Sequence, residues 1–220
     1  MARNWDCSRR SLLRGAALGA AALWTPGVMA EALSLTPRQT EGPFYPDHLP
    51  LDTDNDLLVI NDSLSPAVGE VAHVSGRILS PAGEPIRNAL VEIWEADSGG
   101  NYIHSRSRSP EPRDTNFQGF GRFLTGSSGE YYFRTIKPAP YTRRTPHIHF
   151  AIYRGEQRVL TTQMYIDGHP LNDRDQVIRR LEPEAKQLCM AEFKPLPGSA
   201  TGEWVAHWDV VIGVTPEDEH

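Results

Sequence analysis

Hydrophobic and polar residues alternate in several short segments of this chain, and this alternation is typical of β-strands. The predicted strands cover residues 71–79, 89–96, 121–124, 131–136, 147–153, 159–166 and 204–212. We expect residues 121–124 and 131–136 to form a hairpin, because only a Gly- and Ser-rich segment separates them. Residues 147–153 and 159–166 are expected to pair in the same way.

Helical periodicity is confined to one region near the C-terminus. It begins at Asp173 and places Val177, Ile178 and Leu181 on one face. Pro183 interrupts the pattern and is placed to open a second turn of helix. Many short strands with so little helix predict an all-β fold, an antiparallel β-sandwich with short peripheral helices.

The segment before the first strand is different in composition. Residues 31–70 are rich in Pro, Asp and Asn without a sustained period, which predicts an extended N-terminal arm. Residues 71–220 then form a single sandwich domain, since no repeat or linker divides them. Within the arm, residues 40–46 (TEGPFYP) predict a rigid turn that carries aromatic side chains.

The N-terminus has the pattern of an export signal. Arg9 and Arg10 precede a short apolar stretch, and small residues end at Ala30, which predicts a signal peptide over residues 1–30. The paired arginines favour the twin-arginine route of bacteria, with an ordinary secretory signal as the alternative. The apolar stretch is too short to be a membrane anchor. We therefore expect a periplasmic or secreted protein.

Charge and cysteine content narrow the possible partners. The chain has a net charge of −6, and removal of residues 1–30 would take away four arginines and one aspartate, leaving −9. An acidic protein of this kind is not expected to bind nucleic acid or anionic membranes. Cys7 would leave with the signal, so Cys189 has no partner for an intrachain disulfide. No oligomeric state follows from these features.

Candidate chemistry begins with two histidines in the predicted strand 147–153. Alternation places the imidazoles of His147 and His149 on one face and Ile148 on the other. Two neutral imidazoles on one face can bind the same metal ion. Taken alone, the pair is equally consistent with ordinary strand histidines.

Two tyrosines make a metal site the better interpretation. Tyr102 follows the end of a predicted strand, and Tyr141 lies in a proline-rich loop before the histidines. Each alone would be read as a packed turn residue, but together with the histidines they supply two nitrogens and two oxygens. Because a phenol has a pKa near 10, its anion requires a strongly acidic ion. Ferric iron meets this requirement, whereas zinc prefers thiolate, imidazole and carboxylate.

Four sequence runs carry a resemblance to a known family. They are VEIWEADSGGNYIH, FQGFGRFLTGSSGEYYFRTIKPAPY, RTPHIHF and LTTQMYIDGHPL. Together they closely resemble the intradiol ring-cleavage dioxygenases over about residues 40–170, especially the iron-bearing chain of protocatechuate 3,4-dioxygenases and exported single-chain members. The ordered set of two tyrosines and HxH in these contexts is highly specific.

The resemblance implies a mononuclear, non-haem Fe(III) centre and a ring-cleaving reaction. By this likeness Tyr102 and His149 are equatorial ligands, and Tyr141 and His147 are axial ligands. The substrates would be an aromatic diol and O2, and the products cis,cis-muconate-type diacids. Tyr141 would also act in catalysis, as the ligand that leaves and accepts a proton from the diol.

Further residues match positions around the family's substrate. Arg144 corresponds to an arginine that stabilises negative charge developing on the ring, and Gln163 to a glutamine near the ring-opening oxygens. The substrate pocket would be lined by Gly42, Pro43, Phe44 and Trp94.

Two other function classes stay open. A non-enzymatic, transthyretin-like β-sandwich that binds carbohydrate or protein would explain the fold and the export signal, but not the tyrosines and histidines. A zinc hydrolase would require a carboxylate or a third histidine, and none is suitably placed in the sequence.

Overall fold

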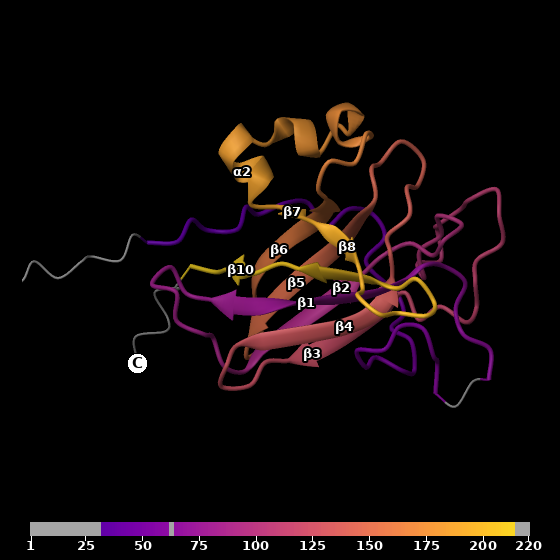
Figure 1. The fold of residues 1–220 in the computed structure, drawn as a ribbon, viewed down its shortest axis with the longest axis horizontal. Coiled ribbons are helices and arrows are strands. Elements are labelled where there is room, and N and C mark those ends of the chain that lie inside the picture. The colour runs from indigo at the N-terminus through magenta and orange to yellow at the C-terminus, as the bar shows by residue number, and fades with distance from the viewer. Residues whose placement is uncertain (1–31, 62–63, 214–220) are drawn as a thin grey trace, which may run out of the picture. The chain divides into compact units, whose positions relative to one another are not determined.

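The fold consists of two β-sheets that pack face to face (Figure 1). The computed structural model describes residues 32–61 and 64–213 of the 220-residue chain. The predicted signal peptide, residues 1–30, therefore lies outside the described residues. Two sheets with very little helix confirm the predicted all-β class.

The first sheet is built around β1 (Val71–Leu79), which was predicted with these bounds. β1 pairs antiparallel with β4 (Glu130–Ile136). It pairs parallel with β9 (Trp204–His207) and β10 (Val210–Val211), and β8 (Phe193–Pro195) follows β9 at the edge. The predicted final strand is thus divided between β9 and β10.

The second sheet has the order β3-β2-β5-β6-β7. Its strands are β2 (Ala89–Trp94), β3 (Phe120–Leu124), β5 (His147–Arg154), β6 (Gln157–Ile166) and β7 (Met190–Ala191). β5 occupies the centre between β2 and β6, and the predicted pairing of β5 with β6 is confirmed. The β6–β7 pair is parallel, so both sheets are mixed.

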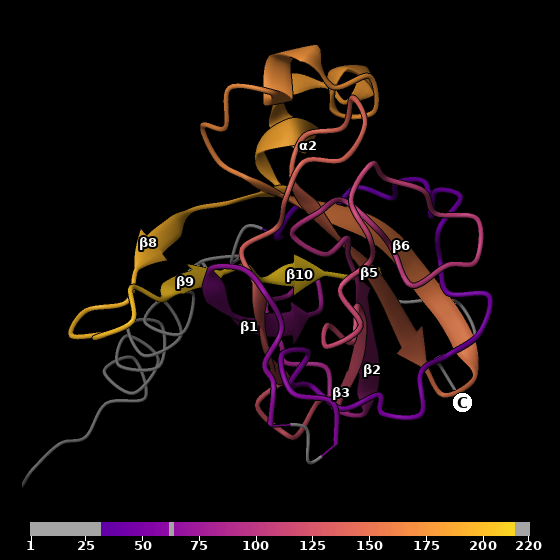
Figure 2. The same cartoon turned by 90° about the vertical axis from the view of Figure 1, so that its right-hand side faces the viewer.

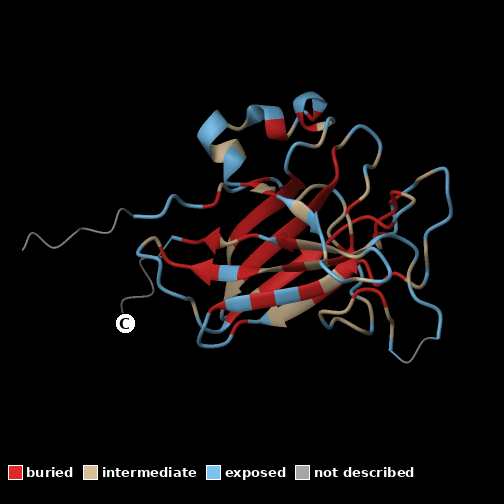
Figure 3. Ribbon diagram, in the orientation of Figure 1, coloured by how far each residue is buried: buried red, intermediate tan, exposed pale blue. Residues whose placement is uncertain are grey.

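Large apolar side chains from both sheets fill the space between them. Phe150 of β5 lies 5.8 Å from Tyr131 of β4 and 5.0 Å from Trp208, measured between ring centroids. Ile148 and Ile152 point to the same side of β5 as Phe150 and belong to the same core cluster. Figure 3 shows how burial concentrates along these strands. The core therefore faces one side of β5, and the other side is left for different residues.

The predicted hairpin between residues 121–124 and 131–136 is wrong. β3 pairs with β2 in the second sheet, whereas β4 pairs with β1 in the first. The connection crosses between sheets because each end bonds to a different one. Thr125 exchanges hydrogen bonds with Ala89, while the carbonyl of Gly129 accepts from the amide of Ile78.

The helical region near the C-terminus is more broken than its periodicity predicts (Figure 2). It contains two 3-10 turns, η2 (Asn172–Arg174) and η3 (Ile178–Arg180), separated by Asp175 in an extended conformation. Helix α2 (Pro183–Gln187) begins at the proline, as predicted. In the part of the chain that the structure describes, no helix has the length and apolar character needed to cross a bilayer.

The described part of the arm, residues 32–61 and 64–70, contains no strand or helix. It is attached to β6, because the amide of Gln39 donates to the carbonyl of Thr161 at 2.8 Å. The Gln39 side chain donates to the carbonyl of Gln163 at 3.0 Å. These bonds place the turn at residues 40–46 over the outer face of the second sheet, where the histidines lie.

Candidate metal centre

β5 presents His147 and His149 on the outer face of the second sheet. Their Nε2 atoms lie 3.2 Å apart, and each residue is only 2% exposed. Ile148, between them, points into the core on the opposite side. The predicted common face of the two imidazoles is thereby confirmed.

Both imidazoles are neutral and can offer lone pairs to a cation. Burial, with the nearby charge of Arg144, lowers the pKa of His147 to about 3. Burial also lowers the pKa of His149 well below its usual value, and His147 and Arg144 add to this. Nδ1 of His147 donates to the carbonyl of Thr145 at 2.6 Å, which leaves its Nε2 unprotonated.

Tyr102 reaches the histidines from the loop that follows β2. Its hydroxyl oxygen lies 3.3 Å from Nε2 of His147, and the residue is 1% exposed. The loop is held by Asp97, whose Oδ1 accepts from the amides of Gly99 and Asn101. The amide of Tyr102 itself donates to Ser107 Oγ at 2.9 Å. Tyr102 is therefore a firmly fixed side chain.

Tyr141 approaches the same point from the loop between β4 and β5. Its ring centroid lies 5.0 Å from that of Tyr102 and 5.6 Å from that of His147. Its carbonyl accepts from the amide of Arg144, which closes a tight turn with Thr142 at φ 50°. Gly100 packs against it, since a Cβ there would lie 3.2 Å from Cβ of Tyr141. Unlike Tyr102, Tyr141 is only partly buried.

The donor set fits ferric iron. Burial raises the pKa of Tyr102 well above that of a free phenol, so only a strongly acidic cation could hold it as an anion. Two phenolates and one hydroxide would balance the charge of Fe(III), which suits a buried site. Within residues 32–61 and 64–213, no three His, Cys, Asp or Glu side chains gather as zinc would require. The oxygens of this donor set are the phenol oxygens of Tyr102 and Tyr141.

Arg144 lies beside this centre and is held by two side chains. Its Nε donates to Asp175 Oδ2 at 2.7 Å, and its Nη2 donates to Gln163 Oε1 at 2.6 Å. Gln163 is fully buried, and its own amide nitrogen donates to the carbonyl of Thr40 at 2.8 Å. Both ends of the Gln163 amide are therefore already bonded within the protein.

Asp175 is the residue that the sequence analysis missed. It is fully buried, and its pKa lies below the ordinary value because hydrogen bonds from Arg144 and from backbone amides outweigh the effect of burial. The available signal was its position two and three residues before Val177 and Ile178, from whose amides it accepts hydrogen bonds. That signal indicates a local cap and contains no information about Arg144.

The predicted pocket residues occupy two different positions. Phe44 stacks on Tyr102 with ring centroids 5.4 Å apart and meets Tyr141 edge-on at 6.0 Å. Gly42, at φ 74°, lies against His149, and Pro43 is exposed between Gly42 and Phe44. Trp94 is fully buried and stacks on His149 at 4.7 Å, so it can shape a pocket only through that imidazole.

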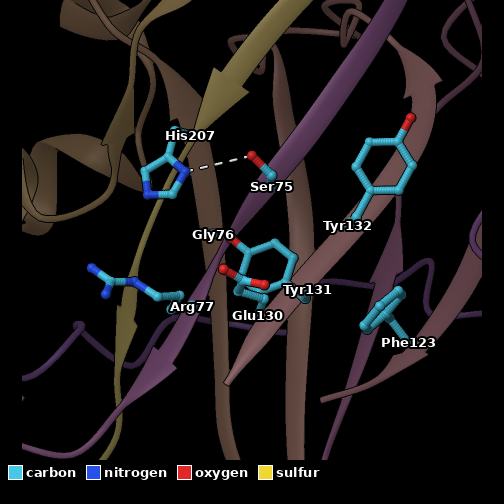
Figure 4. Close-up of a pocket in the computed structure, with 8 residues that line it drawn as sticks. All are labelled: Ser75, Gly76, Arg77, Phe123, Glu130, Tyr131, Tyr132 and His207. Carbon is cyan, nitrogen blue, oxygen red and sulfur yellow. Dashed lines mark hydrogen bonds between the residues drawn. The ribbon is translucent and has the colours of Figure 1, made fainter. Parts of the chain in front are cut away.

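An open groove of ≈ 500 Å³ lies elsewhere, on the outer face of the first sheet (Figure 4). Polar side chains of neighbouring strands line it, among them Ser75, Arg77, Tyr132 and His207. None of the four candidate ligands lines this groove. It is therefore separate from the candidate metal centre.

Comparison with protein families gives one match over most of the chain. The family model described as "Dioxygenase" matches residues 40–212. The chain is 38% identical over 136 residues to the protocatechuate 3,4-dioxygenase beta chain of Burkholderia cepacia, which covers 57% of each protein. It is 31% identical to catechol 1,2-dioxygenase 1 of Acinetobacter lwoffii, over 62% of this chain and 48% of the relative. The chain spans about half the length of the curated relatives it matches.

Solved structures agree with these matches. The dioxygenase domain of a dioxygenase–carbohydrate-binding protein fusion from Streptomyces sp. SirexAA-E is 30% identical, with a TM-score of 0.62 over 83% of this chain and 100% of that one. An intradiol ring-cleavage dioxygenase from Tetranychus urticae has a TM-score of 0.64 at 21% identity, covering 82% and 95%. At that identity the second likeness supports the fold alone.

Proposed function

Because the chain belongs to the intradiol ring-cleavage dioxygenase family, we propose that it cleaves catechol-type rings between the two hydroxylated carbons with O2. The products would be cis,cis-muconate-type diacids. The observation that carries the proposal is the convergence of Tyr102, Tyr141, His147 and His149 on one point. Relatives named for protocatechuate, catechol and hydroxyquinol support a catechol-type substrate.

The four converging side chains would hold a mononuclear, non-haem Fe(III) ion. When bound, such an ion keeps the tyrosines ionised, binds a deprotonated diol and makes its ring reactive towards O2. The two imidazoles are already neutral, so among the four side chains only the tyrosines must lose protons when the ion binds. Iron binding is therefore expected to release protons.

The two tyrosines have different roles in the proposed reaction. A catechol must lose two protons to bind through both oxygens, and Tyr141 is the partly buried ligand on a loop. With iron bound, the Tyr141 phenolate oxygen would take up one of these protons as an internal base, and the hydroxide would take up the other. Tyr102, packed under Phe44, stays in place throughout.

Arg144 and the aromatic residues complete the site. The Arg144 guanidinium stabilises negative charge as it develops on the ring, which is the general role of preorganised donors. Phe44 covers Tyr102, and Trp94 covers His149, so both protein ligands are shielded from water. Lower dielectric around the centre strengthens the effect of the Arg144 charge.

A first experiment tests the activity itself. The purified protein is loaded with Fe(III), and O2 uptake and product formation are followed with catechol, protocatechuate and hydroxyquinol. We expect consumption of one O2 per ring and a muconate-type diacid from at least one substrate. A protein that binds no iron, and cleaves none of the three, would instead support the non-enzymatic binding module.

Adjacent arginines supply a matched pair of variants for the role of Arg144. Arg144→Ala should lower kcat by roughly 100-fold at near-normal iron content, because the charge it stabilises appears only during the reaction. Arg143→Ala should have little effect, since Arg143 is exposed. Equal losses in both variants would contradict the assignment.

Export by the twin-arginine route is proposed on the sequence alone. Arg9 and Arg10 stand ahead of the apolar stretch in the predicted signal peptide. Replacement of both by lysine should retain the protein in the cytoplasm of a bacterial host, as seen by cell fractionation. Unchanged export would show that the ordinary secretory route suffices.

A further inference from the structure

The guanidinium of Arg144 is held in one orientation. Asp175 accepts from Nε and Gln163 accepts from Nη2, on two sides of the group. Because all N–H bonds of a guanidinium lie in its plane, two such contacts fix both the plane and its rotation. Among the residues that the structure describes, none bonds to Nη1, which leaves that nitrogen available for a ligand.

Asp175 is itself held by several hydrogen bonds. Oδ2 accepts from the amide of Thr145 at 2.9 Å in addition to Arg144, and Oδ1 accepts from the amides of Val177 at 2.8 Å and Ile178 at 3.1 Å. The carboxylate thus has four donors and no exposed surface. A side chain bonded in this way has no alternative rotamer to adopt without leaving buried donors unpaired.

The same carboxylate also connects Arg144 to a candidate ligand. Thr145 donates its amide to Asp175 and accepts from Nδ1 of His147 through its carbonyl. Asp175 therefore positions the guanidinium and the backbone that orients His147 at the same time. Because Asp175 neutralises the pair as a whole, what it adds for a ligand is the orientation of the remaining Arg144 N–H groups.

We propose that Asp175 is a positioning residue for ring cleavage, which directs Nη1 of Arg144 at the substrate ring. The inference rests on the proposed function, because it assumes that the ring binds where Tyr102, Tyr141, His147 and His149 converge. Asp175 does not touch the ring. It acts through Arg144, with Gln163 as the second contact that holds the same group.

The first test is Asp175→Asn, which keeps the size but places an NH2 group against N–H donors. We expect kcat for catechol to fall about 10- to 100-fold, as for other residues that orient a site. The Kd of catechol without O2 should stay equal or decrease, because the variant gains one positive charge beside an anionic ligand. A raised Kd with unchanged kcat would overturn the proposal.

Asp209→Asn is the matched control. Asp209 also accepts from a backbone amide and a guanidinium, those of Arg77 at 2.8 and 2.9 Å, but Arg77 belongs to β1 of the first sheet and lines the groove of Figure 4. This variant should leave both kcat and Kd unchanged. A loss equal to that of Asp175→Asn would mean that an Arg–Asp pair far from the candidate centre, with Arg77 exposed and Asp209 half-buried, has the same effect, which contradicts a positioning role.

A double-mutant cycle separates positioning from a general structural effect. If Asp175 acts through Arg144, D175N should lower kcat per bound iron less than twofold in the R144A background, whereas any effect through Thr145 and His147 would appear in the iron content. The same fold loss with and without Arg144 would show that Asp175 acts on the structure alone.

A measurement on metal-free protein needs neither activity nor a folded D175N variant. In a ¹H–¹⁵N spectrum of arginine side chains, the Nε–H of Arg144, assigned by its loss in R144A, should exchange with solvent at least tenfold more slowly than that of exposed Arg143. Equal exchange rates would overturn the proposal. Because this readout does not depend on ring cleavage, it tests whether the Arg144 guanidinium is held separately from whether the proposed function is correct.

Discussion

The two tyrosines illustrate how burial separates residues that look alike in sequence. Tyr102 is 1% exposed, and its amide is bonded to Ser107. Tyr141 is partly buried and is followed by Thr142 at φ 50°, an uncommon conformation for a β-branched residue. Tyr102 is thus suited to be a permanent ligand, and Tyr141 one that can leave.

Phenylalanine variants test this difference. Tyr141→Phe should retain iron with a weaker, shifted visible band and bind catechol at least tenfold more slowly, because an internal base is missing. Tyr102→Phe should lose most of its iron or its colour, since nothing replaces its charge. Iron content, visible spectra and stopped-flow binding would be measured for both. Iron loss in Tyr141→Phe, with iron and rapid binding kept in Tyr102→Phe, would reverse the roles.

Glu95 is a buried acid that predicts a pH dependence of stability. Burial raises its pKa from 4.5 to about 8; Thr135 donates to one oxygen, and the other has no partner within the described residues. The folded protein therefore keeps the proton over a range in which the unfolded chain has lost it. The contribution of protonated Glu95 to the free energy of unfolding is fully present below about pH 4.5. It is lost as the pH rises towards 8.

Glu95→Gln should remove this dependence, because an amide does not ionise. Denaturant unfolding of metal-free protein would be measured at pH 5 and pH 8. Between these values the free energy of unfolding of Glu95→Gln, relative to that of wild type, should increase by about 1.4 kcal/mol per pH unit. Glu130→Gln, at an exposed position, serves as the control and should follow wild type. Parallel curves for wild type and Glu95→Gln would contradict the raised pKa.

At the scale of elements, the arm is the segment that completes the site without belonging to either sheet. Tyr45 donates to Glu92 Oε2 at 2.9 Å, and Arg122 donates to the other oxygen of the same buried carboxylate. Tyr45 also packs edge-on against Trp94 at 5.0 Å. The neighbouring Phe44 is positioned over Tyr102 by these contacts.

Tyr45→Phe should therefore loosen the arm and weaken substrate binding. Loss of a hydrogen bond to a buried carboxylate should cost about 1–3 kcal/mol of unfolding free energy, and KM for catechol should rise more than kcat changes. Tyr132→Phe is the control, because it removes a hydrogen bond to His73 on the first sheet. It should lower stability without changing substrate binding at the candidate centre. A KM increase in both variants would contradict a specific role of the arm in substrate binding.

At the scale of the whole molecule, a metal ion would join segments that are far apart in the chain. The candidate ligands come from the loop after β2, the loop before β5 and β5 itself. An ion that binds only the folded state stabilises it by mass action.

Removal of iron should accordingly lower Tm. A stabilisation of about 2–3 kcal/mol corresponds to roughly 4–12 °C for a domain of this size. Reduction and chelation should produce this decrease, and added Fe(III) should reverse it, as measured by calorimetry. The double variant His147→Ala/His149→Ala should show no iron-dependent shift. A Tm that does not respond to iron in wild type would contradict the proposed centre.

The sequence by itself determined the all-β class, the face shared by His147 and His149, and the start of α2 at Pro183. Each follows from a local rule, because the alternation of a strand decides which side chains share a face, and proline suits the first turn of a helix. The family was likewise predictable, since the ordered tyrosines and HxH occur in specific contexts.

Only the tertiary structure decided the partners of these elements. Alternation does not say which strand pairs with which, so the crossing at residues 125–129 appeared as a hairpin in the sequence. Asp175 and Arg144 are 31 residues apart, and their contact arises where the chain after β6 packs beside the loop before β5. The sheets therefore position the ligands by local geometry, whereas the orientation of Arg144 depends on long-range packing.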